Sequence, residues 1–313
     1  MERHQVWIYL VGLLAGLAAG SMWPQAAGSL EVAVWPALAV LLYATFTQVR
    51  LRSIGRALAD ARFLVTALTA NFLIMPALVW GLIQLTPPDD ALRLGLLLVL
   101  LVPCTDWFIT FAQLGRGDGA RAIALTPVNL LLQLALLPGY LWLMAPARVG
   151  AAISSADLWP ALVVVLGPLL LAAFTEPILR RHRAGERIRG RLGLLPVPLL
   201  TLVIFLVAAA HTQVASQTAH LLPVVIAVVV AYLLGALLVA KVGTVVVGLS
   251  APAGRTLAFT LATRNSFVVL PVALALPDGW EVAALVIVMQ SLVELFGMIG
   301  SLWLVPRVLI RDS

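Results

Sequence analysis

The chain has 313 residues, of which 62% are hydrophobic and 11% are charged, and its mean hydropathy is +1.05. A soluble domain is about 45–50% apolar and about 25% charged, so this composition excludes a soluble protein and favours a chain solvated mostly by lipid. The net charge of +6 does not indicate nucleic acid, because it comes from one lysine and from arginines grouped at the ends of apolar runs.

Ten apolar runs follow one another along the chain, and each is long enough to be read as a membrane-spanning helix. The first run follows Arg3 and resembles a cleaved signal peptide. We favour a retained helix, because an even number of spans needs it. The eighth run is long enough to tilt in the bilayer. The runs cover residues 5–22, 31–48, 62–84, 92–114, 122–145, 158–178, 194–212, 219–248, 256–276 and 281–306.

The basic residues are distributed unevenly between the two sides of this arrangement. Of the 20 lysines and arginines, Arg93 and Arg148 fall on one side, Arg264 lies within a span, and all the others fall on the opposite side. Because positive loops stay in the cytoplasm, both termini are predicted to be cytoplasmic, in the plasma membrane. The densest basic segment, residues 180–191, is interpreted as a linker that fixes topology, and the alternative is a patch for lipid headgroups.

The chain divides into two related halves, residues 1–150 and 151–313. Each half holds five spans, so the second is inverted relative to the first, and the predicted fold is an all-α membrane protein of two inverted five-helix repeats. The fourth and ninth spans correspond. Both are interrupted, by Pro-Cys-Thr-Asp at 103–106 and by Thr-Arg-Asn-Ser at 263–266. Polar interruptions at matching places in two halves are the best indication of a transport site.

Three charged side chains lie at membrane depth: Asp106, Arg264 and Glu294. A charge at the bilayer centre costs about 2.5–3.5 kcal/mol, so each needs a partner or a function. If the interrupted helices cross, Asp106 and Arg264 face each other, either as a structural ion pair or as participants in binding or coupling. Glu294 is either a neutral acid bonded to a neighbouring helix or a group that couples protons or contacts substrate.

Cys104 is the only cysteine and follows Pro103 in the first interruption. A lone cysteine in an apolar run is usually a small buried residue. Beside Asp106 and the backbone groups that a proline frees, it is also a candidate ligand for a soft, thiophilic solute. Asn71 and Gln133 are interpreted as hydrogen-bonding links between helices. The other candidates for the site are Thr105, Asn129, Thr263, Asn265 and Ser266.

At these residues the sequence resembles the bile acid/sodium symporter superfamily and, within it, the arsenical-resistance permeases that export arsenite. The segments that carry the likeness are 102–107 with the glycine-aspartate turn at 114–118, 259–267, and 292–294. The resemblance implies a panel domain and a core domain, with two crossed, broken helices in the core. It also implies that Cys104 is the metalloid ligand and that Glu294 is the coupling carboxylate.

The chain departs from both branches of this superfamily at the interruptions. The sodium-coupled branch has an acidic residue and a glutamine where this chain has Thr260 and Arg264, and the fixed positive charge would repel sodium. The arsenite permeases have small neutral residues where this chain has Asp106 and Arg264. The two charges either neutralise each other and leave an arsenite site, or leave Arg264 to contact an anion.

The leading expectation is therefore a secondary active transporter that exports arsenite or a related trivalent metalloid, coupled to protons, with its site at the crossing. A phosphate-binding loop ending in Gly-Lys-Ser or Gly-Lys-Thr is missing from the sequence, so a gradient supplies the energy unless a separate ATPase is the partner. We expect a small-molecule or ion substrate and a lipid bilayer as partners, with no cofactor and no nucleic acid.

Three alternatives compete with this expectation. The alternative on the same scaffold is an organic-anion transporter in which Arg264 contacts the anion. An intramembrane enzyme is disfavoured, because no histidine and only one aspartate lie at membrane depth. A channel is disfavoured, because the polar residues form one central cluster and not a stripe of pore length.

Overall fold

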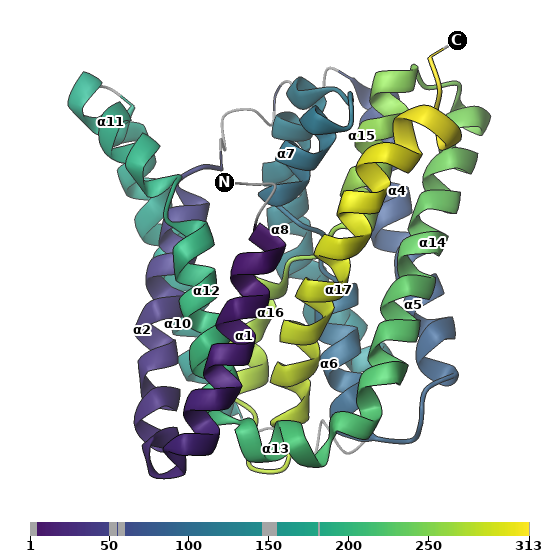
Figure 1. Ribbon diagram of the computed structural model, residues 1–313. Coiled ribbons are helices and arrows are strands. Elements are labelled where there is room, and N and C mark those ends of the chain that lie inside the picture. The colour runs from purple at the N-terminus through teal and green to yellow at the C-terminus, as the bar shows by residue number, and fades with distance from the viewer. Residues whose placement is uncertain (1–4, 50–54, 56–59, 146–154, 181, 313) are drawn as a thin grey trace.

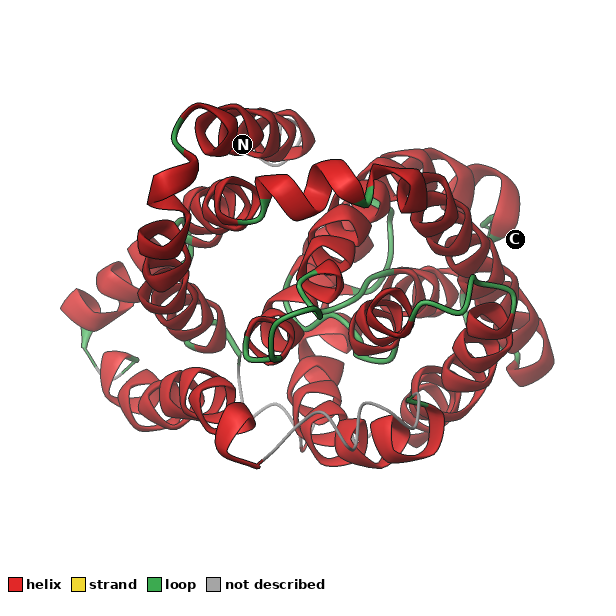
Figure 2. Ribbon diagram, turned by 90° about the horizontal axis from the view of Figure 1, so that it is seen from below, coloured by secondary structure: helices red, strands yellow, loops and turns green. Residues whose placement is uncertain are grey.

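The computed structural model describes residues 5–49, 55, 60–145, 155–180 and 182–312, and these residues form helices and loops without a β-strand (Figure 2). Eight helical segments are long and apolar enough to cross a membrane. They correspond to eight of the ten predicted runs. The other two, at 92–114 and 256–276, each form two short helices with a break between them, as the interruptions predict. The inverted repeat of 1–150 and 151–313 remains a prediction.

A first group of helices, here called the panel, packs on the left of Figure 1. Its helices α1 and α12 approach each other closely: a Cβ added to Gly12, Gly16 or Gly20 of α1 would collide with α12 or with Thr212, just beyond it. Small residues at this spacing allow the backbones of membrane helices to meet. The panel contains α1 (Gln5–Met22), α2 (Ala27–Phe46), α10 (Ser155–Leu179) and α12 (Pro196–Ala210); α1 and α2 are joined by the short turn η2 (Pro24–Ala26).

A second group, here called the core, surrounds the two broken helices (Figure 1). The first broken helix consists of α6 (Asp90–Leu100) and α7 (Trp107–Leu114), and the second of α15 (Ala251–Ala262) and α16 (Ser266–Leu274). The remaining core helices are α4 (Ala61–Thr69), the π-helical turn η4 (Ala70–Ile74), α5 (Met75–Gln84), α8 (Gly119–Met144), α14 (Leu222–Val247) and α17 (Val282–Leu304), which ends in the π-helical turn η6 (Val305–Leu309). Two short elements, α13 (Thr212–Gln217) and η5 (Ala219–Leu221), connect panel to core.

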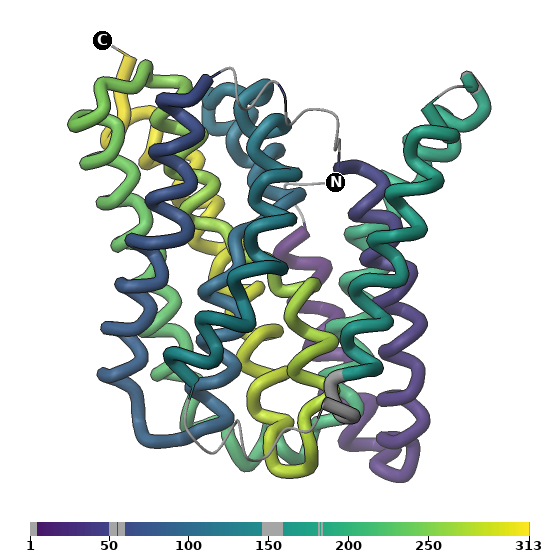
Figure 3. The backbone as a smooth tube through the Cα atoms, turned by 180° about the vertical axis from the view of Figure 1, so that it is seen from behind, coloured from purple at the N-terminus to yellow at the C-terminus, as the bar shows by residue number. Residues whose placement is uncertain are grey.

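The basic segment predicted as a linker forms a helix, α11 (Arg183–Leu192), over most of its length. It lies at the same end of the molecule as both termini and extends away from the bundle (Figures 1 and 3). Arg189 pairs with Glu186 and donates a hydrogen bond from Nη1 to Gln48 Oε1, over 3.1 Å, just beyond α2. Charges of opposite sign three residues apart support this helical turn, and the role of the segment as a linker that fixes topology remains a prediction.

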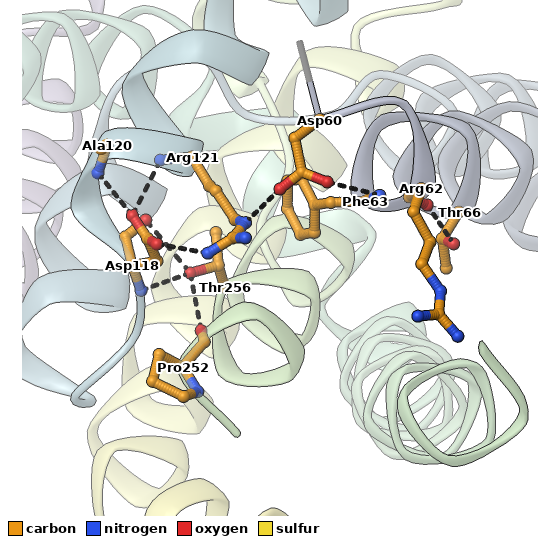
Figure 4. Close-up of polar contacts among 9 residues, drawn as sticks. All are labelled: Asp60, Arg62, Phe63, Thr66, Asp118, Ala120, Arg121, Pro252 and Thr256. Carbon is orange, nitrogen blue, oxygen red and sulfur yellow. Dashed lines mark hydrogen bonds and ion pairs between the residues drawn. The ribbon is translucent and has the colours of Figure 1, made fainter. Parts of the chain in front are cut away.

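A charged cluster links three core helices at the end that carries the C-terminus (Figure 4). Arg121 of α8 pairs with Asp60 at 2.6 Å and with Asp118 at 2.5 Å, and the backbone N–H of Asp118 donates to Thr256 Oγ1 of α15 over 2.7 Å. Burial opposes ionisation of Asp60, but the hydrogen bonds from Arg121 and from the backbone N–H of Phe63 outweigh it and lower its pKa below the ordinary value. The cluster therefore favours an ionised Asp60 that ties α4 to α8.

Candidate functional site

The breaks in the two interrupted helices cross and satisfy each other's backbone groups. Pro103 and Arg264 form an isolated antiparallel bridge. The backbone N–H of Cys104 donates to Thr263 O over 3.1 Å, and that of Asn265 donates to Val102 O over 2.8 Å. Irregular backbone is tolerated at membrane depth only where protein or a water-filled cavity satisfies it. The predicted crossing is thus confirmed, and its hydrogen bonds satisfy backbone groups that the two breaks leave without helical partners.

Side chains at the crossing add a second set of hydrogen bonds. Asn265 Nδ2 donates to Thr105 Oγ1 over 3.0 Å, which joins the two breaks. Ser266 Oγ donates to Gln290 Oε1 of α17 over 2.9 Å, whereas Thr263 Oγ1 bonds back to its own helix, at Phe259 O. Of these candidate residues, the structure therefore brings Thr105 and Asn265 together and directs Thr263 and Ser266 elsewhere.

A cavity of about 690 Å³ lies between panel and core, beside the crossing. Thr105 and Asp106 form part of its wall, and Gln5 and Gln48 line it at the helix ends. The exposed Gly193 of the α11–α12 junction also lines it, so the cavity opens toward the end of the molecule that carries both termini. Asp106 is the only carboxylate among the described lining residues, and none of them is a lysine, arginine or histidine.

Asp106 connects this cavity to the only thiol. Its Oδ1 accepts hydrogen bonds from Cys104 Sγ, over 3.1 Å, and from the backbone N–H of Trp107, over 2.7 Å, so it also caps the start of α7. Asp106 is half-buried and lines the cavity, whereas Cys104 is 1% exposed and does not line it. A solute in the cavity therefore meets the carboxylate before it reaches the thiol.

Three aromatic residues that were not predicted from the sequence, Tyr9, Trp107 and Phe267, also line the cavity. The rings of Trp107 and Phe267 stack with centroids 5.2 Å apart, and the ring of Tyr9 lies 6.0 Å from that of Trp107. Tyr9 belongs to the panel and the other two to the core, so this contact spans the two groups. Trp107 and Phe267 each follow an interruption within two residues, which was the signal available in the sequence.

Of the two readings of Asp106 and Arg264, the structural ion pair is not formed in the described structure. The guanidinium of Arg264 turns back toward the end of α15, where it donates to Leu261 O over 2.6 Å, and it donates to Asn71 Oδ1 over 3.1 Å. It also lies over the ring of Tyr232, with 5.1 Å between its Cζ and the centroid. Within the described part of the chain it pairs with no carboxylate side chain. The reading as an ion pair was wrong because the first carbonyls available to the guanidinium belong to its own half-helix.

Glu294 contacts the second break through the backbone. Its Oε2 accepts from the backbone N–H of Arg264 over 2.9 Å and from Gln290 Nε2 over 2.6 Å. Because Gln290 also accepts from Ser266, a continuous chain of hydrogen bonds joins α17 to the start of α16. The hydrogen bond between Glu294 and a neighbouring element is therefore observed, whereas the neutral state of the carboxyl and its role in coupling remain predictions.

The mid-span amides lie behind the crossing. Asn129 Nδ2 and Asn71 Nδ2 each donate to Thr260 Oγ1, over 3.3 Å and 3.4 Å. Asn71 and Asn129 thus link α15 to η4 and α8, and Asn129 does not line the cavity. The buried amide of Gln133 has no hydrogen-bond partner in the described part of the chain, so its interpretation as a link between helices was wrong.

Two broken helices that cross beside a cavity between two helix groups define a multi-pass membrane transporter. Residues 35–247 match the Sodium Bile acid symporter family, and the chain belongs to that family. Across 98% of its length the chain is similar to the arsenical-resistance protein Acr3 of Corynebacterium glutamicum, with 24% identity and coverage of 90% of that protein. The family resemblance drawn from the interruptions and from 292–294 is therefore confirmed.

Proposed function

We propose that the chain is a secondary active transporter of the plasma membrane that exports arsenite or a related trivalent metalloid in exchange for protons. One observation carries this proposal: the thiol of Cys104 lies 3.1 Å from a carboxylate that lines the cavity. Soft thiolate ligands select soft acceptors, and trivalent arsenic is one. The similarity to an arsenical-resistance protein supports the same class of substrate.

The substrate enters from the end of the molecule with both termini, which is the cytoplasmic end by the distribution of basic residues. A neutral hydroxylated solute then meets the hydroxyl of Thr105, and Asn265 orients that hydroxyl from the second break. Cys104 becomes a ligand when α7 moves enough to open its hydrogen bond with Asp106, and the thiol proton then leaves with one hydroxyl of the solute as water. Panel and core then move relative to each other, and the contact between Tyr9 and Trp107 separates.

Proton coupling is assigned to the carboxyls of the crossing. When ionised, Glu294 accepts the backbone N–H of Arg264, and that bond weakens when the carboxyl takes a proton. Protonation at α17 therefore changes how tightly the second break is held. Asp106 provides the corresponding group at the first break, because its carboxylate holds both the thiol and the start of α7.

The alternative, an organic-anion transporter, needs a positive group at the cavity. The lining of the described cavity has no lysine, arginine or histidine, and the guanidinium of Arg264 bonds to carbonyls on the far side of the break. Nothing in this arrangement favours an anion.

Transport into everted membrane vesicles tests the proposal. Vesicles from cells that lack their own arsenite exporter should accumulate arsenite when they carry this chain and an inside-acid pH gradient is imposed. Dissipating the gradient should stop accumulation. Vesicles that take up taurocholate and not arsenite would refute the proposal and support the alternative. The matched control is Ser291→Ala, because among the described residues the Ser291 hydroxyl bonds only within its own helix, to Ile287 O.

A further inference from the structure

The guanidinium of Arg264 occupies the point where the two broken helices end. α6 ends at Leu100 and α15 ends at Ala262. Backbone carbonyls of both accept from the guanidinium: Leu100 O at 3.4 Å, Leu261 O at 2.6 Å and Thr260 O at 3.5 Å. The C-terminal end of a helix carries a partial negative charge from its unsatisfied carbonyls. Two such ends therefore converge on one positive group.

The other partners of this guanidinium are also those that a cation takes. Asn71 offers the oxygen of its amide, which is fixed because its Nδ2 donates to Thr260 Oγ1. Tyr232 offers the face of its ring, which attracts cations through its quadrupole. Arg264 is 3% exposed, so water does not compete for these groups. In the described structure its guanidinium bonds to neutral oxygens and lies over a ring, and the nearby carboxylate of Glu294 bonds to its backbone N–H and not to the guanidinium.

Carbonyls at helix ends, an amide oxygen and a ring face are groups that together can bind a cation. Transporters with discontinuous helices coordinate sodium or protons through unwound carbonyls and the C-terminal ends of half-helices. We propose that Arg264 is a tethered cation that fills such a position between the ends of α6 and α15, so that the crossing is stable and transport proceeds without sodium. A free cation cannot share these oxygens with the guanidinium, because like charges in contact repel strongly in a site of low dielectric.

This inference rests on the chain being a transporter and not on its substrate. It differs from a merely structural role, in which the arginine is a donor that ties helix ends together. A structural donor leaves unpaired carbonyls when it is removed, and any loss of stability is then independent of which salt is present. A tethered cation leaves a vacant site that small cations can enter.

Thermal unfolding of the purified protein distinguishes the two readings. The wild type should unfold at the same temperature in sodium chloride and in N-methyl-D-glucamine chloride at equal ionic strength. Arg264→Ala should unfold at a lower temperature in N-methyl-D-glucamine, and sodium or low concentrations of guanidinium should raise its midpoint saturably, by roughly 2–4 °C. Arg264→Lys should behave as the wild type does, because it keeps the charge.

The matched control is Arg255→Ala. Arg255 is also a buried arginine of α15 and also donates to a carbonyl, Ile310 O at 2.9 Å, but it pairs with Asp312 at 2.8 Å. Its loss should lower the midpoint equally in all salts. Where Arg264→Ala does not fold, Arg264→Gln takes its place, because the amide keeps a donor and loses the charge.

Two results would overturn the inference. One is a wild type whose midpoint or transport rate depends on sodium, since its site would then still be open. The other is a neutral Arg264 variant that no small cation stabilises. Sodium-dependent transport of arsenite by the wild type would overturn this inference and leave the proposed substrate intact. Failure to transport arsenite in any salt would refute the proposed substrate. The unfolding measurements would still decide the role of Arg264.

Discussion

Asp106 combines two functions that are usually separate. It caps the first turn of α7 by accepting the backbone N–H of Trp107, and it presents the one carboxylate among the described cavity-lining residues. The Cys104 thiol donates to that same carboxylate oxygen. A substrate that binds the thiol must displace this hydrogen bond, so binding at Cys104 and the start of α7 are mechanically linked.

Replacing the thiol tests this link. We expect Cys104→Ser to abolish arsenite resistance and transport, because a hydroxyl has almost no affinity for trivalent arsenic but can still donate to Asp106. The variant should therefore fold and insert as the wild type does. Resistance of cells and transport by vesicles, normalised to the amount of protein in the membrane, measure the effect. Full resistance at equal expression would show that Cys104 only fills space.

A double mutant tests whether the charges of Asp106 and Arg264 compensate each other. Removing one partner of a buried ion pair is usually worse than removing both, so a true pair would show recovery. Because Arg264 bonds to carbonyls and Asp106 to the thiol and to Trp107, we expect no recovery. Asp106→Ala with Arg264→Ala should transport no better than the worse single variant. Recovery of transport in the double variant would show that the two charges do compensate each other.

At the scale of helices, the positions of the elements could be predicted wherever apolar runs and helix-breaking residues determine them. The apolar runs agree with the helices within a few residues, and both interruptions fall where Pro103 and Thr263 indicated. The directions of side chains at the crossing were not predictable. The backbone bridge fixes them, and that bridge joins residues more than 150 positions apart. The same is true of Tyr9, whose contact with Trp107 depends on how panel and core meet.

The close packing of α1 and α12 gives a prediction for the panel. A Cβ at Gly16 would collide with the carbonyl oxygen of Phe205, so Gly16→Leu must push the helices apart. Overpacking of this kind costs about 1–3 kcal/mol, and we expect the unfolding midpoint to fall by roughly 2–4 °C for each kcal/mol. Gly167→Leu in α10 is the matched control, because a Cβ there meets nothing within 4 Å. Equal midpoints for the two variants would contradict the packing argument.

The cluster around Arg121 predicts how stability depends on pH. The pKa of Asp60 is lower in the folded protein, so its contribution is fully present above the unfolded pKa, which is about 4. This contribution is lost as the pH falls through the lower, folded value. Asp60→Asn should therefore lower the unfolding midpoint at neutral pH and weaken its acid dependence. Asp278→Asn, at an exposed carboxylate, is the control and should change neither. Parallel acid profiles for the wild type and Asp60→Asn would contradict the role of the cluster.

For the whole molecule, the cavity, the basic helix α11 and both termini share one end (Figures 1 and 3). If that end is cytoplasmic, the structure is in the state that receives a substrate for export. The crossing lies at the inner end of the cavity, and the panel reaches it through Tyr9. On the proposed mechanism, export requires the panel and the core to part at the opposite end of the molecule, where α13 and η5 connect them.

Cysteine labelling decides this orientation. On the Cys104→Ser background, which has no other cysteine, Pro88→Cys and Arg187→Cys place one thiol at each end of the molecule, at exposed positions. Because basic segments are retained in the cytoplasm, an impermeant reagent should label position 88 and not position 187 in intact cells. Permeabilised cells should be labelled at both, which controls for reactivity. Labelling of position 187 in intact cells would show that the orientation is opposite to the predicted one. The cavity would then face outward, and the proposed direction of transport would be refuted.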